Sequence, residues 1–308
     1  MPEPLDTVRD RPSLGRMKEK RAIDGFGATA LTGFAALLAF NQVVIKVTGE
    51  GFGPLFQAGL RSLGALVILL MWFRYRGVSL DLPRGTAFWG VVSGLFFTIE
   101  FVLLYMALDR TTVARASILF YTMPVWLALA AHLFLPGERL TGARILGLGL
   151  AMGGVVIALA DRGPGGAASL SGDMMALNAA LGWAGIALTV RMTSLGEVRP
   201  LVQLFFQLTV SAPILLALAP VFGPLLHDPR PIHWAGLGFQ ILAVASLGYL
   251  FWFWLLTIYR ASTVAAFSFL SPVFAVFFGW AILGERIALS IWLALALVVA
   301  GLVLVNRK

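Results

Sequence analysis

The sequence predicts an all-α integral membrane protein with ten transmembrane helices, arranged as two inverted repeats of five helices. Apolar residues make up 59% of the 308 residues, charged residues only 12%, and the mean hydropathy is +0.88. A soluble domain carries about 25% charged residues. The apolar runs are about twenty residues long, which is the length that crosses a bilayer as a helix. Because hydrocarbon offers no hydrogen bonds, each run must pair its own backbone groups as a helix.

One pattern occurs twice along the chain. The segments 119–139 and 267–286 each contain an internal Pro-Val step, at Pro124 and Pro272, and each ends in Gly-Glu-Arg. In both copies a Gly follows fifteen residues after that Arg. A long pattern repeated at matched spacing indicates a tandem repeat, and we place its seam near 163–172.

The apolar runs give the boundaries of the ten predicted spans. These lie at roughly 25–46, 54–74, 85–107, 112–134, 142–160, 173–192, 200–221, 234–256, 262–282 and 287–305. The predicted organisation is a cytoplasmic N-terminal tail at 1–24, a first five-helix repeat at 25–162, a linker at 163–172 and a second five-helix repeat at 173–308.

The distribution of basic residues predicts the orientation. With the N-terminus inside, sixteen Lys and Arg residues fall in cytoplasmic segments and six on the opposite side. This excess favours cytoplasmic placement of both termini in a bacterial inner membrane. Because five spans per repeat is an odd number, the second repeat enters the membrane from the opposite side. Inverted repeats of this kind are typical of secondary transporters, which alternate between two openings.

Several kinds of chemistry are absent from the sequence. The chain has no Cys, its three His show no metal-ligand spacing, and no phosphate-binding glycine-lysine loop, HExxH or G-x-S-x-G motif occurs. We therefore expect no metal, no cofactor and no enzymatic activity. The net charge of +8 does not indicate nucleic-acid binding, because the basic residues lie in short loops, as membrane topology requires. The expected partners are a small-molecule substrate and the lipid bilayer, and the oligomeric state is left open.

The repeated motifs resemble those of a known family. The Pro-Val and Gly-Glu-Arg steps, with 114–117 leading to Pro124 and 261–263 leading to Pro272, are similar to the EamA family of the drug/metabolite transporter superfamily. Within it the chain looks most like bacterial aromatic amino acid exporters of the YddG type. The resemblance covers nearly the whole chain after residue 24 and is specific for the fold. It implies a central cavity lined by the first, third, fourth, sixth, eighth and ninth spans, with the fifth and tenth outside.

Polar residues within the spans are candidates for substrate binding. Glu100 stands near the middle of the third span, where a carboxylate is costly unless it faces a partner or a wet cavity. It is predicted to contact a substrate ammonium or carry a coupling proton; the alternatives are a structural pair with a buried Arg such as Arg61, or a permanently protonated, hydrogen-bonded acid. Lys46, Asn41 and Gln42 are candidates for the substrate carboxylate, although Lys46 is equally explained as a residue that extends to the interface.

Aromatic residues deep in the spans form a second candidate set. Tyr121, Trp183, Tyr249 and Trp252 would suit a flat apolar substrate through stacking. For any single ring, ordinary packing is the simpler explanation.

Other features carry structural expectations. Pro124 and Pro272 are predicted to kink their helices or act as hinges for alternating access. Arg115 is interpreted as extending to the interface, and Gly149 with Gly153 is expected to allow close helix packing.

Together these features predict a secondary transporter that exports small organic metabolites, amino acids including aromatic ones, by alternating access through a central cavity. A permease for another solute class, such as drugs or nucleotide sugars, is the alternative within transport. A membrane enzyme or receptor without transport is the alternative outside it.

The charge asymmetry gives a direct test of topology. Reporter fusions at Lys308 and within 222–233 should report opposite sides of the membrane, with the C-terminus cytoplasmic, because basic loops stay inside. Activity of compartment-specific reporters in intact cells measures this. The same side for both positions would contradict the ten-span inverted repeat.

Overall fold

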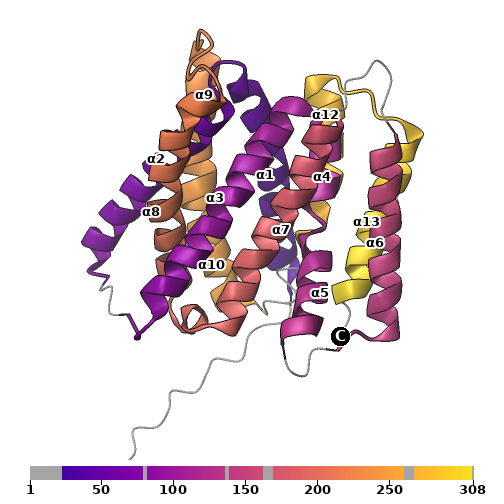
Figure 1. The fold of residues 1–308 in the computed structure, drawn as a ribbon, viewed down its shortest axis with the longest axis horizontal. Coiled ribbons are helices and arrows are strands. Elements are labelled where there is room, and N and C mark those ends of the chain that lie inside the picture. Colours follow the sequence, from indigo (N-terminus) through magenta and orange to yellow (C-terminus); the bar gives the residue numbers. More distant parts are fainter. Residues whose placement is uncertain (1–22, 79–81, 136–138, 162–168, 260–266, 307–308) are drawn as a thin grey trace, which may run out of the picture.

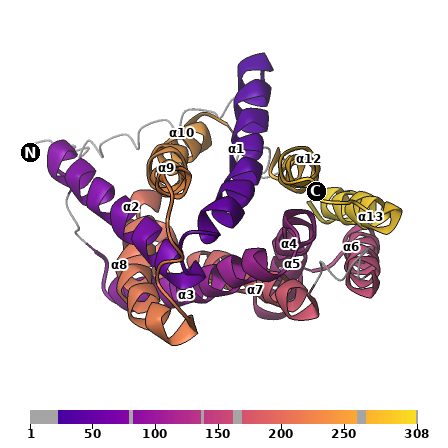
Figure 2. The ribbon, with the colours of Figure 1, turned by 90° about the horizontal axis from the view of Figure 1, so that it is seen from above.

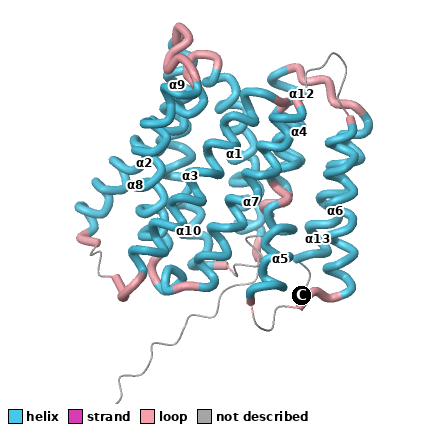
Figure 3. The backbone as a smooth tube through the Cα atoms, viewed as in Figure 1, coloured by secondary structure: helices cyan, strands magenta, loops and turns pink. Residues whose placement is uncertain are grey.

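The computed structural model describes residues 23–78, 82–135, 139–161, 169–259 and 267–306, and over these it is a bundle of helices (Figures 1 and 3). The helices of the first half are α1 (Gly25–Gly49), α2 (Pro54–Arg76), α3 (Thr86–Arg110), α4 (Val113–Phe120), α5 (Met123–Phe134) and α6 (Gly142–Ala160). Those of the second half are α7 (Leu170–Met192), η2 (Ser194–Glu197), α8 (Pro200–Leu218), η3 (Ala219–Phe222), α9 (Pro231–Phe239), η4 (Gln240–Gly248), α10 (Tyr249–Ile258), α12 (Leu270–Leu283) and α13 (Leu289–Asn306).

Within the described residues, eight helical stretches are long and apolar enough to cross a membrane. The predicted spans at 262–282 and 287–305 are represented by the shorter apolar helices α12 and α13, so ten crossing helices remain a prediction. Most of the predicted tail at 1–24 and of the linker at 163–172 lies outside the described residues.

Turns interrupt the predicted fourth and ninth spans, and the predicted eighth span includes the π-helix η4. The fourth span breaks into α4 and α5 at Tyr121 and Thr122, and Pro124 stands second in α5. At that position a missing backbone N–H costs no intrahelical bond, and the fixed φ of proline favours a helix start. Pro272 is likewise the third residue of α12. Where the sequence predicted a kink or a hinge at Pro124, the fourth span has a break and a new helix starts; the hinge role stays a prediction.

The fifth and tenth spans form one edge of the bundle. Figure 2 shows α6 and α13 side by side at this edge, with α2 and α8 at the opposite one. A Cβ on Gly147 or Gly154 would come within 2.7 Å of backbone carbonyl oxygens of α13, so these glycines permit the close approach. The predicted pair was wrong, because nothing lies within 4 Å of a Cβ placed on Gly149 or Gly153.

A buried ion pair holds the interior of the bundle together. Arg115 near the start of α4 is 3% exposed, and Asp173 in the first turn of α7 is fully buried. Their Nη2 and Oδ2 atoms are 2.5 Å apart, and Arg115 Nε donates to Asp173 Oδ1 at 3.1 Å. The Thr111 hydroxyl at the end of α3 donates to the same carboxylate at 2.8 Å, and Arg115 Nη2 donates to the Ala158 carbonyl oxygen in α6. Four helices therefore meet at one charge pair.

This pair corrects the interpretation of Arg115 as a residue that extends to the interface. An Arg that reaches the interface leaves its charge in water, whereas the Arg115 charge is buried and neutralised by Asp173. Asp173 was not singled out from the sequence, although it is the one acidic residue within the predicted sixth span.

Removal of one partner should be strongly destabilising, because it leaves an uncompensated buried charge. We expect Asp173→Ala to lower the free energy of unfolding by about 3–5 kcal/mol, measured by thermal melting in detergent. Asp109→Ala, at an exposed position near the end of α3, is the matched control and should change little. An apolar double variant, Arg115→Met with Asp173→Leu, should recover much of the loss. Equal melting temperatures for the two single variants would contradict the structural role of the pair.

Candidate functional site

Charged residues from two apolar helices approach each other deep in the bundle. Arg61 on α2 is 2% exposed and Glu100 on α3 is 6% exposed. They interact electrostatically but make no direct ion pair. Tyr249, the first residue of α10, is hydrogen-bonded to Arg61 and interacts electrostatically with Glu100. The structure therefore brings two of the predicted site residues, Glu100 and Tyr249, to one place with Arg61.

Close packing of α3 on α7 sets the position of Glu100. A Cβ on Gly182 would lie 3.2 Å from backbone and Cβ atoms of Glu100, which is tighter than ordinary contact. A Cβ on Gly185 would meet the Phe96 ring at 2.7 Å. Glycine at these positions lets the two helices approach. Trp183 follows Gly182 in sequence, so it belongs to α7, the helix that packs against α3 at Glu100.

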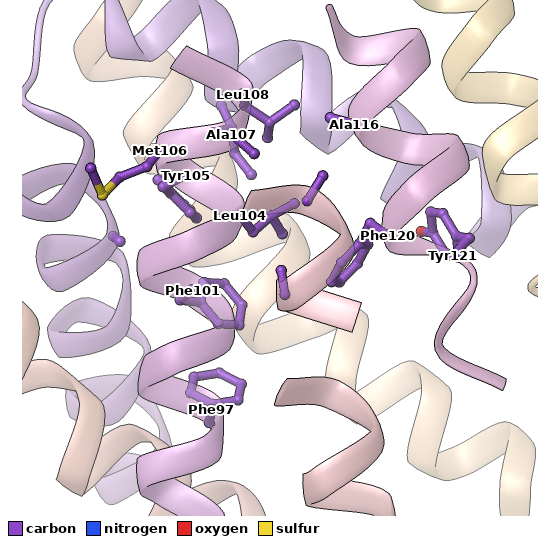
Figure 4. Packing of buried hydrophobic residues seen from close by; sticks show 14 of the residues in the cluster. Phe97, Phe101, Leu104, Tyr105, Met106, Ala107, Leu108, Ala116, Phe120 and Tyr121 are labelled. Carbon is purple, nitrogen blue, oxygen red and sulfur yellow. The ribbon is translucent and has the colours of Figure 1, made fainter. Parts of the chain in front are cut away.

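An aromatic cluster adjoins the charged residues. Trp183 stacks on Phe120 with ring centroids 5.0 Å apart, and it meets Tyr121 edge-on at 5.9 Å. Figure 4 shows Phe120 and Tyr121 at the end of α4, and Phe97 with Phe101 one turn apart on α3. Tyr121 is also an electrostatic neighbour of Glu100 and Tyr249. Four predicted substrate-binding residues, Glu100, Tyr121, Trp183 and Tyr249, are thus brought together.

The polar residues of α1 divide between two places. Asn41 and Gln42 are buried, and their side-chain carbonyl oxygens have no hydrogen-bond partner in the described part of the chain. Lys46, one turn further on, donates from Nζ to the carbonyl oxygens of Leu108 at 2.9 Å and Thr111 at 2.5 Å. Lys46 therefore holds the C-terminal end of α3, where a cation is favoured by the helix dipole.

Trp252 has a different neighbourhood from Trp183. Its ring stacks on Phe34 of α1 with centroids 4.9 Å apart. It packs with Leu31, Leu255 and Tyr259, which form a small core cluster separate from the one that includes Tyr121. The expectation that one cage contains all four aromatic residues is therefore not met for Trp252, because the packing of α10 places it against α1.

A cavity lies at the end of the bundle where α12 ends and α4 begins. Its volume is about 430 Å³, and its lining includes Lys46, Glu285 and Arg286. The Glu285 carboxylate accepts hydrogen bonds from the backbone N–H groups of Val113 at 2.6 Å and Ala114 at 3.1 Å. Glu285 follows α12 in the second half of the chain and thus caps the N-terminus of α4 in the first half. Glu138, the corresponding residue of the first copy, lies outside the described residues.

The environment of Glu285 shifts its ionisation. Burial raises the pKa of the Glu285 carboxyl above its ordinary value, while the backbone N–H groups of Ala114 and Val113 and the charge of Lys46 oppose this rise.

Comparison with known proteins identifies relatives across the whole chain. The model of the EamA-like transporter family matches residues 25–160 and again 170–307. The chain is 30% identical to "Uncharacterized transporter YvbV" of Bacillus subtilis, over 89% of this chain and 92% of that protein. It is 26% identical to a "Probable amino-acid metabolite efflux pump" of Escherichia coli, over 85% and 88% of the two chains. A protein of the same name from Salmonella typhimurium is 29% identical, over 88% and 93%.

A solved structure has the same fold. A protein described only by the words "Crystal structure of protein" superposes with a TM-score of 0.63, over 90% of this chain and 97% of that one, at 22% identity. The likeness extends to the fold alone.

Loss of the Glu285 cap should destabilise α4. We expect Glu285→Ala to cost about 0.5–2 kcal/mol, as for other lost N-caps, measured by thermal melting in detergent. The pKa of Glu285 is higher in the folded state than in the unfolded state. The contribution of Glu285 to the free energy of unfolding is therefore full below the unfolded-state pKa and is lost as the pH rises through the folded-state pKa. The difference in melting temperature between Glu285→Ala and the wild type should therefore become smaller with increasing pH.

The control is Glu50→Ala, which removes an exposed carboxylate from the rim of the same cavity. It should change the melting temperature little, because surface ion pairs contribute little. If both variants melt alike at every pH, the capping role of Glu285 is wrong.

Proposed function

Since the chain belongs to the EamA-like transporter family, we propose that it exports small organic metabolites, amino acids including aromatic ones, by alternating access through a central cavity. Family membership makes it a multi-pass membrane protein and a transporter rather than an enzyme. The substrate class, the direction of transport and the central cavity are the proposed part. The family match does not extend to the narrower type of aromatic amino acid exporters, which we propose on the site itself.

The observation that carries the proposal is the joint burial of an acid and an aromatic cluster. Glu100 supplies a negative charge for a substrate ammonium, next to the rings of Tyr121, Trp183 and Phe120. Aromatic surfaces bind flat apolar groups by stacking, and the Glu100 carboxylate makes one end of the site polar. The names of the relatives from Escherichia coli and Salmonella typhimurium support the amino acid class.

Helix contacts support two inverted repeats. In an inverted repeat, α1 of the first half corresponds to α7 of the second, and the fourth span (α4 and α5) corresponds to α12. The packing of α1 on α12 is then matched by the packing of α7 on α4 and α5. In the same way, the packing of α3 on α7 is matched by the packing of α9 on α1. The remaining helices each pack on the helix that corresponds to them in the other half: α2 on α8, and α6 on α13. Such an exchange is what a pseudo-two-fold axis produces, and it is the basis of alternating access.

The paired prolines fit the same scheme. Pro124 follows the break between α4 and α5, and Pro272 follows turn residues Ser268 and Phe269 at the start of α12. We propose these breaks as hinges, since they are short non-helical turns at the middle of corresponding spans. The start of the ninth span, 262–266, lies outside the described residues. The proposed location is the bacterial inner membrane, with both termini cytoplasmic.

The alternative within transport is another solute class, such as drugs or nucleotide sugars. A purely cationic drug would leave the Arg61 charge without a counter-charge, and a nucleotide sugar would place added negative charge beside Glu100. A zwitterion avoids both costs, which favours amino acids.

Flux of labelled amino acids in proteoliposomes tests the function. Wild-type protein should transport phenylalanine and tryptophan, and Trp183→Ala should weaken these substrates about three- to tenfold while leaving threonine unchanged, because one stacking surface is lost. Trp292→Ala on α13, which removes an exposed ring, is the matched control and should leave all substrates unaffected. Equal loss for aromatic and small substrates would assign Trp183 to packing, and absence of amino acid flux in wild type would refute the proposed class.

A further inference from the structure

Arg61 is a buried cation whose donors are incompletely used. It lies in the third turn of α2 and is 2% exposed, and its side chain is hydrogen-bonded to Tyr249, yet its Nε and Nη1 atoms have no hydrogen-bond partner among the described residues. Arg115 is buried to the same extent, but its Nε and Nη2 atoms both meet the Asp173 carboxylate. No carboxylate of the described residues contacts Arg61. A buried charge without a carboxylate partner is costly, so the contacts of Arg61 with Phe101 and Tyr249 do not by themselves compensate its charge.

The surroundings of Arg61 suit one kind of partner. The guanidinium of Arg61 lies over the Phe101 ring, with Cζ 4.5 Å from the ring centroid. A contact with an aromatic ring uses none of the N–H donors of the guanidinium in a conventional hydrogen bond, so they stay available to an acceptor. A carboxylate binds a guanidinium edge in the same plane, through parallel N–H···O bonds. The geometry of Arg61 on Phe101 is thus suited to an incoming carboxylate.

The charges of the site favour a zwitterion. When Glu100 is ionised, Arg61 and Glu100 together have no net charge, and the two side chains interact without a direct ion pair. A ligand with one positive and one negative group compensates both residues and adds no net charge to an apolar region. A ligand with a single charge compensates only one of them.

The other candidates for the carboxylate are less suitable. Lys46 uses its Nζ atom on the Leu108 and Thr111 carbonyl oxygens at the end of α3. The unpaired atoms of Asn41 and Gln42 are oxygens, which repel a carboxylate. These oxygens are suited to accept hydrogen bonds from an ammonium group instead.

We infer that Arg61 binds the carboxylate of the transported amino acid, while Glu100 on the neighbouring helix binds its ammonium group. This inference rests on the proposed function and revises its site: Arg61 takes the role that the sequence suggested for Lys46. The aromatic cluster of Phe120, Tyr121 and Trp183 then receives the amino acid side chain.

Three ligands that share one ring separate the two charge contacts. Phenylalanine has both groups, phenethylamine lacks the carboxylate and 3-phenylpropionate lacks the ammonium. Binding to purified protein in detergent is measured by calorimetry, and uptake is measured in proteoliposomes. Arg61→Gln should weaken phenylalanine and 3-phenylpropionate on the order of 10- to 100-fold and leave phenethylamine unchanged, as expected for loss of a charged hydrogen bond. Glu100→Gln should weaken phenylalanine and phenethylamine and leave 3-phenylpropionate unchanged.

Controls separate recognition from folding. Arg76→Gln changes an exposed Arg of the same helix and should leave all three affinities intact. Arg61→Lys retains the charge and should keep the preference for carboxylate ligands over phenethylamine, with folding checked by melting and monodispersity. If either Arg61 variant weakens all three ligands equally while remaining folded, Arg61 is a helix linker and the inference is overturned. It is also overturned if Arg61→Gln unfolds and Arg61→Lys shows no carboxylate preference.

The same panel distinguishes this inference from the proposed function. If wild type binds and transports 3-phenylpropionate but not phenylalanine, and Arg61→Gln abolishes that binding, the amino acid class fails and the carboxylate role of Arg61 stands. If phenylalanine is transported and Arg61→Gln transports it normally, the proposed function stands and the role of Arg61 fails.

Discussion

The cost of burying charge among apolar helices governs the arrangement of this protein. A charged group within a membrane-spanning bundle requires a counter-charge, a set of hydrogen bonds or a wet cavity. Arg115 has the Asp173 carboxylate, Lys46 has two carbonyl oxygens at the end of α3, and Glu285 has two backbone N–H groups at the start of α4. Each of these solutions joins helices that are distant in sequence.

The structural charges concentrate at one end of the bundle. Lys46, Thr111, Arg115 and Glu285 surround the place where α3 and α12 end and α4 begins. Glu285 belongs to the second half of the chain and caps a helix of the first half, so this end links the two halves. In an alternating transporter, links of this kind are the contacts that an opening movement at that end has to break.

Arg61 and Glu100 differ from these residues because they make no direct ion pair, and the Nε and Nη1 atoms of Arg61 have no hydrogen-bond partner among the described residues. A cluster of aromatic rings adjoins Glu100, and Gly182 lets α7 pack closely on α3 at this residue. Glu100 also has no acidic counterpart in the second half, where Gly248 takes the matched position. A repeat-built scaffold thus contains an asymmetric centre, as expected when a fold made of two similar halves binds a substrate whose two ends differ.

The sequence by itself determined the membrane-embedded helical class, the doubled Pro-Val and Gly-Glu-Arg pattern, the approximate span positions and several residues worth attention, including Glu100, Tyr121 and Trp183. Only the tertiary structure decided the partners: Asp173 for Arg115, Arg61 beside Glu100, Phe34 for Trp252, and Gly147 with Gly154 in place of Gly149 with Gly153. The reason is physical. In a soluble helix the apolar face points inward, but lipid and protein interior are both apolar, so hydrophobicity does not specify which face of a membrane helix meets its neighbours. Those faces are selected by small residues and polar contacts between segments far apart in the chain, which no local pattern in the sequence reveals.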